Sequence, residues 1–420
     1  MTVDFHPAAA ELRAAALAAR EASRALARSP AAQRNRALTA AAAALRARQD
    51  SVLAANLLDL QSYEGLPSLR DRLRLDARRV EAMAVGLEEI AALPDPLGHV
   101  MAEWTRPNGL QFRRVSTPIG VIGMIYESRP NVGADAAGIC LKSGNAVILR
   151  GGSDSFQSAG AIHAAIAEGL RAADLPEAAV QVAPGRDRAV VAAKLAGSGL
   201  IDHVIPRGGK GLVTRVQAES RVPVLAHAEG LCHTYVHAAA DPEMARRIMA
   251  NAKMRRTDVC GATETLLIDA AIAPRLLPAI VADLRALGCD FRADAAAQAI
   301  VADVPPASEA DFHTEWLDRV LSIRVVAGVD EAIAHIAAYG SEHTEAIITE
   351  DAAAAEHFLN ATSSAVVLWN ASTQFCDGGE FGFGAEIGIA TGRIQARGPV
   401  GVEQLTTFRY QVRGAGQVRP

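Results

Sequence analysis

Cysteine is the residue type in this chain best suited to covalent chemistry, and one of the five cysteines stands apart. Cys260 follows closely after Lys253, Arg255 and Arg256. Nearby positive charge favours the thiolate, which is the form of cysteine that attacks electrophilic carbon. Cys260 is therefore a candidate nucleophile, although its surroundings alone leave a purely structural role open. For Cys140 and Cys232, which lie in or beside apolar runs, burial as small hydrophobic residues is the better interpretation.

Two other kinds of side chain could assist a nucleophile. Asn131 follows Pro130 just after an apolar run, where its amide could point at a developing oxyanion, although a turn after proline explains it equally well. His335 and His343 flank a Tyr-Gly-Ser segment at an expected helix end. For these two we expect a contact with the helix C-terminus for one and surface exposure for the other.

A glycine-rich loop could hold a phosphate. Residues 208–211 are Gly-Gly-Lys-Gly and follow Arg207, so backbone N–H groups at a helix start and two cations, Arg207 and Lys210, could surround an anion. The loop is not a P-loop, because Val204 stands where that motif requires its first glycine. The Gly-x-Gly-x-x-Gly, Gly-x-Ser-x-Gly and His-Glu-x-x-His motifs do not occur.

Composition excludes several classes of function. The net charge is −5 and the basic residues are scattered, so a nucleic-acid partner is not expected. No apolar run reaches the roughly 20 residues that span a bilayer, and the first residues do not resemble an export signal, so we expect a cytoplasmic protein. An odd number of cysteines without zinc-type spacing indicates neither disulfides nor a structural metal. A small-molecule substrate is the remaining expectation.

The elements that must position these residues alternate between strand and helix. The first hundred residues read as packed helices, with Ser29 as an N-cap before Pro30. Short apolar runs then predict strands, and alanine-rich stretches between them predict helices. The strands are expected at 121–126, 146–149, 179–183, 201–205 and 222–225, and the helices at 158–172 and 188–196. This order predicts a parallel sheet whose ligands bind at the carboxyl ends of the strands.

A second alternating series begins near Thr234 and predicts a second α/β domain. Its strands are expected at 265–268, 321–326, 346–348 and 365–368. Two further segments, around 110–115 and 405–412, alternate with period two and could pair as an interface ribbon. We therefore expect a cofactor domain at 1–228, interrupted by a hairpin near 103–116, a catalytic domain at 229–390, and a return segment with an oligomerisation strand at 391–420.

Several runs together resemble the γ-glutamyl phosphate reductase family, a branch of the aldehyde dehydrogenase superfamily. The resemblance extends from the N-terminal helices to Arg413. The runs that carry it are VIGMIYESRPNV at 121–132, KSGNAVILRGG at 142–152, IPRGG at 205–209, NAK at 251–253, CGATETLL at 260–267, AIAHI at 332–336, GSEHTE at 340–345 and DGGEFGFGAE at 377–386.

That resemblance implies a role for each candidate. Cys260 takes the nucleophile position and Asn131 the position of the oxyanion-binding asparagine. Arg150 stands where relatives place a basic residue on the adenosine ribose, and Glu315 where they place a glutamate on the nicotinamide ribose. Gly208 and Gly209 match the loop beside the cofactor's pyrophosphate and nicotinamide. The chain departs from the family at Thr257, usually proline, and at Gly261, often asparagine, so the loop of Cys260 could be less rigid.

The resemblance also implies a reaction. The Cys260 thiolate attacks glutamyl 5-phosphate, phosphate leaves, and NADPH reduces the thioester to glutamate 5-semialdehyde, the second step of proline synthesis. Arg129 or Lys253 could neutralise the departing phosphate, and Arg150 and Lys210 suit the 2′-phosphate of NADPH. Glutamate 5-kinase is the expected partner enzyme, and a homo-oligomer, dimer or tetramer, is the expected assembly.

Two alternatives stay open at this point. An ordinary aldehyde dehydrogenase would run in the oxidative direction and would need a general base to activate water, and Glu229 lies near the position of that base in such relatives. A binding or scaffold protein that had lost activity would keep the fold alone. The presence of Cys260, Asn131 and the glycine loop together favours an enzyme.

Overall fold

The computed structural model describes residues 7–64, 67–127, 129–183 and 199–419. The chain divides into two compact units. Unit 1 comprises Met1–Ala226, Gly382–Gly388 and Val400–Pro420, and unit 2 comprises His227–Phe381 and Ile389–Pro399. The chain thus leaves unit 1 twice, after Ala226 and after Gly388, and returns to it at Gly382 and at Val400.

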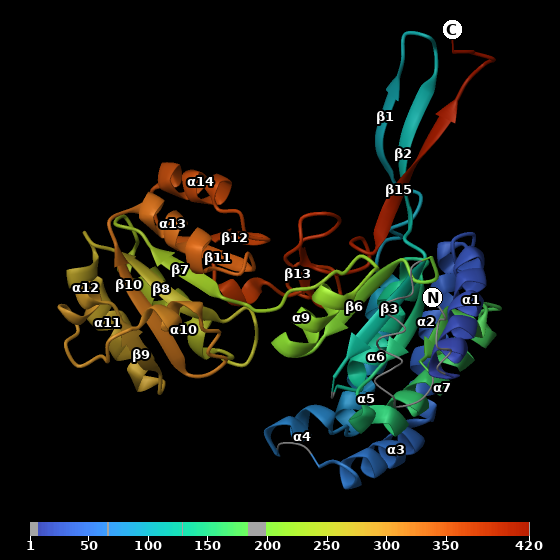
Figure 1. Cartoon of the computed structure of the whole chain (residues 1–420), viewed down its shortest axis with the longest axis horizontal. Coiled ribbons are helices and arrows are strands. Elements are labelled where there is room, and N and C mark those ends of the chain that lie inside the picture. Colours follow the sequence, from blue (N-terminus) through green and yellow to red (C-terminus); the bar gives the residue numbers. More distant parts are fainter. Residues whose placement is uncertain (1–6, 65–66, 128, 184–198, 420) are drawn as a thin grey trace, which may run out of the picture. The chain divides into compact units, whose positions relative to one another are not determined.

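Unit 1 is built on a four-stranded parallel sheet (Figure 1). Its order is β5 (Val180–Val182), β4 (Ala146–Arg150), β3 (Val121–Tyr126) and β6 (His203–Arg207). Every residue of β3 and β4 is buried, which explains why both read as continuous apolar runs in the sequence. Four of the five strands predicted for this region are confirmed, with ends that shift by up to two residues.

The fifth predicted strand, at 222–225, is wrong. This segment makes only an isolated bridge in which Val224 pairs with Val204. Pro223 accepts a hydrogen bond from the backbone of Val204 but has no N–H of its own to extend a ladder. The helix predicted at 188–196 lies outside the described residues.

Helices cover the sheet of unit 1 on both faces. On one face α1 (Pro7–Leu26) packs on β3, β4 and β5. The helix α6 also lies against β3 and β4, and α2 packs on α5, α6 and α7. The bounds of the other helices are α2 (Ala31–Ala47), α3 (Gln49–Gln61), α4 (Pro67–Leu73), α5 (Ala77–Ala92), α6 (Asn131–Lys142), α7 (Phe156–Ala172) and α9 (Lys210–Glu219).

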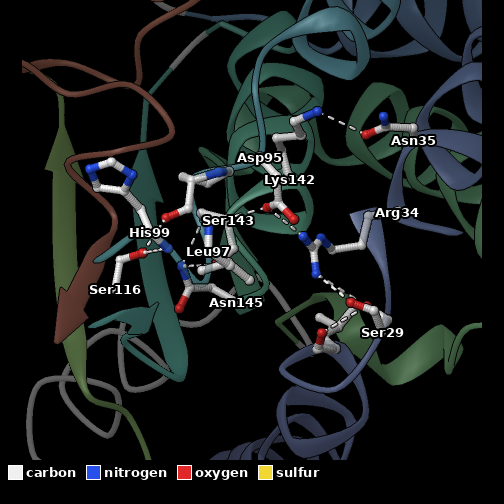
Figure 2. A network of polar contacts seen from close by, with 12 residues as sticks. Ser29, Arg34, Asn35, Asp95, Leu97, His99, Ser116, Lys142, Ser143 and Asn145 are labelled. Carbon is white, nitrogen blue, oxygen red and sulfur yellow. Dashed lines mark hydrogen bonds and ion pairs between the residues drawn. The ribbon is translucent and has the colours of Figure 1, made fainter. Parts of the chain in front are cut away.

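Buried charges join these helices to the start of the sheet (Figure 2). The Lys142 amine is almost fully buried and donates to Asn35 Oδ1 at 2.8 Å and to the Ala91 carbonyl at 2.9 Å. Arg34 is equally buried, forms an ion pair with Asp95 at 2.6 Å and donates to the Ser29 carbonyl. The predicted N-cap at Ser29 is wrong, because Pro30 occupies that position and the Ser29 hydroxyl donates to Leu26 of the preceding helix instead.

A three-stranded antiparallel ribbon extends from the rest of unit 1 (Figure 1). It consists of β1 (Val100–Thr105), β2 (Gln111–Pro118) and β15 (Thr406–Arg413), with β2 in the centre. The expected pairing of segments 110–115 and 405–412 is therefore observed, in the register that places Phe112 opposite Val412. Trp104, Phe408 and Tyr410 remain substantially exposed on it.

Unit 2 contains a six-stranded parallel sheet. Its order is β12 (Val366–Trp369), β11 (Thr344–Ile348), β7 (Cys232–Val236), β8 (Thr263–Asp269), β10 (Val320–Val326) and β9 (Asp290–Ala293). The strands predicted for this region are confirmed. Short elements complete the unit, namely α12 (Ala295–Gln298), β13 (Ile389–Ala390) and β14 (Gly398–Pro399).

Alternate residues of the unit 2 strands form two cores. Leu266 and Ile268 of β8 face one core, with α10 (Pro242–Met254) and α11 (Ala273–Ala286) packed over it. Leu267, between them, faces the other core under α13 (Val329–Tyr339) and α14 (Ala352–Ala361). Helices therefore cover both faces of this parallel sheet.

No helix in the described part of the chain is both long and apolar enough to cross a membrane.

Candidate active site

Cys260 lies in unit 2, in the loop between α10 and β8. Its side chain is partly exposed, whereas the other four cysteines are buried. The burial predicted for Cys140 and Cys232 is confirmed. Cys260 packs against the small apolar cluster of Val366, Cys376 and Ile389. A partly exposed thiol is accessible to a small substrate, which a fully buried thiol is not.

The segment before β7 packs directly on the backbone of Cys260. A β-carbon added to Gly230 would lie 2.1 Å from the Cys260 carbonyl oxygen and 2.7 Å from its Cα, so only glycine fits at this position. Glu315 Oε1 accepts a hydrogen bond from the Gly230 amide at 2.8 Å. The Cys232 thiol, whose pKa burial raises well above its usual value, stays protonated and donates to the Cys260 carbonyl at 3.1 Å. Cys260 is thus held by its main chain.

Lys253 lies under the same loop, in the last turn of α10. Its amine is fully buried and forms an ion pair with Glu264 of β8 at 2.5 Å. The other carboxylate oxygen of Glu264 accepts from the Leu317 amide at 3.2 Å. Burial raises the pKa of Glu264 to about 7, although Lys253 opposes this shift. The pair links α10, β8 and the segment that carries Glu315, and its lysine faces the protein interior.

The two positions that depart from the family pattern lie in a loop that is held from one side. Gln374 donates from Nε2 to the Ala252 carbonyl at 3.1 Å and to the carbonyl of Arg256, which directly precedes Thr257, at 2.9 Å. A β-carbon at Gly261 would lie 3.3 Å from the Thr373 carbonyl oxygen, a tight contact. The segment around 373–374 therefore supports the Cys260 loop and leaves little room at position 261.

Two histidines stand beside Cys260. One ligand atom each from His227, Cys260 and His343 lie within 4.8 Å of one another, and the two imidazole rings meet edge to face with centroids 4.9 Å apart. The expected surface exposure of one of His335 and His343 is wrong, because both are buried. His343 immediately precedes β11 at the buried edge where β7 and β12 also begin, so the sheet itself covers it.

Asn131, in unit 1, is the first residue of α6. Its side-chain amide donates to Asp135 Oδ2 one turn along the helix, at 3.4 Å. Burial raises the pKa of Asp135 to about 6, while Asn131 and Arg207 act in the opposite direction. Arg207, at the end of β6, in turn lies 3.8 Å from Glu386. The amide thus stands at the carboxyl edge of the sheet, among charged groups.

The glycine loop joins β6 to α9, also at the carboxyl edge of the unit 1 sheet. Gly208, Gly209 and Lys210 are all exposed, with Gly209 at the N-cap and Lys210 as the first helical residue. The Gly209 amide donates to Glu127 Oε2 at 3.0 Å, and a β-carbon on Gly208 would meet that carboxylate at 2.3 Å. The amide therefore already points at a negative group, as a phosphate cradle requires.

Arg150 ends β4 beside this loop and is nearly buried. Its guanidinium donates to the Gly151 carbonyl. A cavity of about 390 Å³ lies here within unit 1. It is lined by Ile125, Tyr126, Glu127, Arg150, Gly151, Gly152, Ser153, Gly211, Leu212 and Arg215. It occupies the position, beyond the ends of parallel strands, where such sheets bind ligands.

The candidate residues thus fall into two groups. Cys260, Glu315 and Lys253 belong to one connected network in unit 2, whereas Arg150 and the glycine loop flank one cavity in unit 1. Arg129 is half-buried and precedes Asn131 by two residues.

Sequence reasoning missed His227, Glu264, Glu127 and Asp135. Two of them carried a local signal, since Glu127 directly follows a predicted buried strand and Asp135 lies one helical turn after Asn131. His227 and Glu264 are placed by contacts with other segments.

The chain is similar to known proteins over most of its length. The family model described as the aldehyde dehydrogenase family matches residues 5–299. The chain is 67% identical over 413 residues to a γ-glutamyl phosphate reductase of Acidiphilium cryptum, covering 98% of both chains. It is 68% identical to the enzyme of that name from Gluconobacter oxydans, covering 96% of this chain and 94% of the other. The crystal structure of the Thermotoga maritima reductase superimposes with a TM-score of 0.95 at 43% identity, covering 98% and 100%.

Proposed function

The chain belongs to the aldehyde dehydrogenase family, and from this premise we propose that it reduces L-glutamyl 5-phosphate to L-glutamate 5-semialdehyde with release of phosphate. This reaction is the second step of proline biosynthesis from glutamate. The observation that carries the proposal is the two-thirds identity, over nearly the whole length, to relatives named for it.

Cys260 is proposed as the nucleophile. Its thiolate attacks the acyl carbon of glutamyl 5-phosphate, the carbon–oxygen bond to phosphate breaks, and a thioester on Cys260 results. The contacts of Gly230 and Cys232 support this role, because they fix the backbone from which the thiol projects. Phosphate is a good leaving group, so its departure needs no strong general acid.

We propose that residues of unit 1 supply polar groups to the reacting carbon. Asn131 donates its amide to the oxyanion that develops during attack, for which it must exchange its hydrogen bond with Asp135 for one with the substrate. Arg129 is proposed to neutralise the departing phosphate. Lys253, also expected to contact the substrate, is buried against Glu264, and we propose that it positions the Cys260 loop from below.

A nicotinamide cofactor, when bound, supplies the hydride that converts the thioester to the aldehyde. The residues of unit 1 fit such a group, because a cavity of about 390 Å³ opens beside Arg150 and the Gly209 amide is oriented toward an anion. We propose NADPH rather than NADH. Arg150 and Lys210 would hold the 2′-phosphate, Gly208 and Gly209 would approach the pyrophosphate, and Glu315 would bind the nicotinamide ribose after releasing Gly230.

The dependence on phosphate tests this function against ordinary aldehyde oxidation. Purified protein is incubated with glutamate 5-semialdehyde and NADP, and reduced cofactor is followed with and without inorganic phosphate. Because phosphate is the acyl acceptor in the reverse reaction, we expect turnover only when it is present. Equal rates without phosphate would instead assign the reaction to hydrolysis of the thioester, with Glu229 beside Gly230 as the base that activates water.

Association is proposed on two levels. The exposed aromatic side chains of the ribbon, Trp104, Phe408 and Tyr410, support a homo-oligomer in which this surface is covered. Sedimentation of the purified protein measures its mass, and a monomer at micromolar concentration would contradict the proposal. Because acyl phosphates hydrolyse readily, we also propose that the protein contacts glutamate 5-kinase, the enzyme that makes its substrate. We propose a cytoplasmic location for both enzymes.

A further inference from the structure

We propose that His227, Cys260 and His343 form a binding site for Zn²⁺, and that the ion reversibly blocks the thiol. Each residue offers one ligand atom, and these atoms all lie within 4.8 Å of one another. The three residues come from the start of unit 2, the loop before β8 and the segment before β11, so their spacing in the sequence gives no sign of a metal site.

His343 carries the strongest indication of a ligand. Its side chain is completely buried, and its Nε2 atom has no hydrogen-bond partner. The other nitrogen, Nδ1, lies 2.9 Å from Thr344 Oγ1 and 3.5 Å from Cys232 Sγ. A proton on Nδ1 that is donated to Thr344 leaves a lone pair on Nε2. Leaving such a buried nitrogen unsatisfied destabilises the fold, and coordination of a metal ion would remove this cost.

His227 is oriented in the manner of a metal ligand. Its Nδ1 lies 2.7 Å from the Ile389 carbonyl oxygen, which can only accept, so Nδ1 carries the proton and Nε2 the lone pair. An imidazole that donates one N–H to a carbonyl while its second nitrogen binds metal is a common arrangement in metal sites. The edge-to-face packing of His227 on His343 keeps both rings beside the thiol.

The donor set selects the ion. One thiolate and two imidazole nitrogens suit Zn²⁺, whereas Mg²⁺ and Ca²⁺ prefer oxygen ligands, and the group contains no carboxylate. Tetrahedral Zn²⁺ at its usual bond lengths separates such ligand atoms by roughly 3.3–3.6 Å. Small side-chain rotations from the present spacing achieve this, and the fourth position remains for water. Binding replaces the thiol proton with the metal and so removes the nucleophile from reaction.

The binding claim stands on the three side chains alone, whereas the inhibition rests on the proposed role of Cys260. Titration of metal-free protein with Zn²⁺ against a chromophoric chelator measures stoichiometry and affinity. We expect one ion per chain, and an affinity at least about tenfold lower in each of Cys260→Ser, His227→Gln and His343→Gln. His357→Gln serves as the matched control, because this exposed histidine pairs with Asp330 on the surface of the same unit. Unchanged affinity in the Cys260 and His343 variants would overturn the site.

A second measurement uses the unmodified chain and so does not depend on the folding of any variant. Iodoacetamide labels accessible thiols, and mass spectrometry reports which cysteine reacts. We expect Zn²⁺ to protect Cys260, Mg²⁺ to give no protection, and a chelator to restore labelling. Labelling of Cys260 that is unaffected by saturating Zn²⁺ would refute the proposal. Protection without loss of reductase activity would support the metal site and count against Cys260 as the nucleophile.

Discussion

The two units build their parts of the proposed site in different ways. In unit 2 the backbone of Cys260 is enclosed by Gly230, Cys232 and the segment around Gln374, with the buried pair of Lys253 and Glu264 beneath. In unit 1 the glycine loop is exposed, and Glu127 is the side chain that contacts both of its first two residues. The proposed nucleophile Cys260 is thus rigidly held, whereas the glycine loop proposed to bind the cofactor can rearrange.

This difference fits what each part must do. A nucleophile gains rate from fixed placement, because small displacements at the reacting centre raise the barrier steeply. A dinucleotide must enter and leave in every cycle, and phosphate oxygens are accepted by backbone amides that can exchange Glu127 for the ligand. Substitutions in unit 2 should therefore abolish turnover, while substitutions in the loop of unit 1 should tune cofactor affinity.

Removal of the thiol gives the largest expected effect and separates the two units most directly. For Cys260→Ala we expect the turnover rate to fall by more than roughly 10³-fold, because the thioester is proposed to form on this thiol. Binding of NADPH, measured by fluorescence titration, should stay unchanged, since Cys260 is not among the residues proposed to hold the cofactor and most of these lie in unit 1. Full activity of this variant would remove the covalent mechanism, and loss of cofactor binding would break the division between units.

A single added methyl group tests the rigidity of the Cys260 loop. In Gly230→Ala the new β-carbon would lie 2.1–2.7 Å from backbone atoms of Cys260, which must move. We expect roughly a hundredfold loss of turnover, as for a displacement near 1 Å, and a lower unfolding free energy by about 1–3 kcal/mol. Gly160→Ala, on the exposed face of α7, is the control, since no atom outside its own stretch of helix lies within 4 Å of the added carbon. Equal activity of both variants would show that the loop is not rigid.

The sequence predicted strands more successfully than the contacts that hold the Cys260 loop. Most strands of both sheets were predicted because buried parallel strands are short apolar runs, as at 121–126 and 321–326. The edge strand β9, which contains Asp290 and Arg292, was not predicted. The segment at 222–225 has the same composition, but Pro223 prevents a ladder. Composition reports burial, whereas pairing depends on backbone donors that a hydrophobic pattern does not record.

The contacts within the candidate site were even harder to predict from local sequence. The local neighbours of Cys260 suggested only that positive charge favours a thiolate, and its identification came from the family runs. Lys253 was interpreted as a cation facing substrate because it precedes Cys260 closely, yet the structure pairs it with Glu264. His227 and His343 reach Cys260 only through the order of strands in the sheet. Contacts between segments far apart in the chain cannot be inferred from either segment alone.

Each unit contains a buried carboxyl group, Asp135 in unit 1 and Glu264 in unit 2, that should make folding stability depend on pH. Burial raises the pKa of Asp135 to about 6 and that of Glu264 to about 7, above their unfolded values of 3.8 and 4.5. A raised pKa stabilises the fold below the unfolded value, and this contribution is lost as the pH rises through the folded value. Asp135→Asn should therefore lose stability relative to the unmodified chain near pH 4, and the difference should shrink by about 1–3 kcal/mol near pH 7.

Urea denaturation across this range measures the effect in each unit. Glu264→Gln should show the same trend, with its window extending to about pH 7 rather than 6. Glu88→Gln is the control, because the pKa of this exposed carboxyl is lowered by Arg46 and its contribution must change with pH in the opposite sense. A difference between Asp135→Asn and the unmodified chain that grows with pH would contradict the assignment.

The smallest expected effect lies in the exposed loop of unit 1. Lys210 begins α9 and is solvent-exposed, so its attraction for a 2′-phosphate is weakened by water and salt and amounts to no more than about 1 kcal/mol. In Lys210→Ala we expect KM for NADPH to rise by roughly three- to fivefold, with kcat unchanged. KM for NADH, which lacks that phosphate, should not change. Arg24→Ala, at an exposed pair with Glu21 on α1, controls for loss of a surface charge. An equal rise in KM for both cofactors would place Lys210 at the pyrophosphate shared by the two, and a fall in kcat would mean that the glycine loop is as tightly coupled to the chemistry as the loop of Cys260.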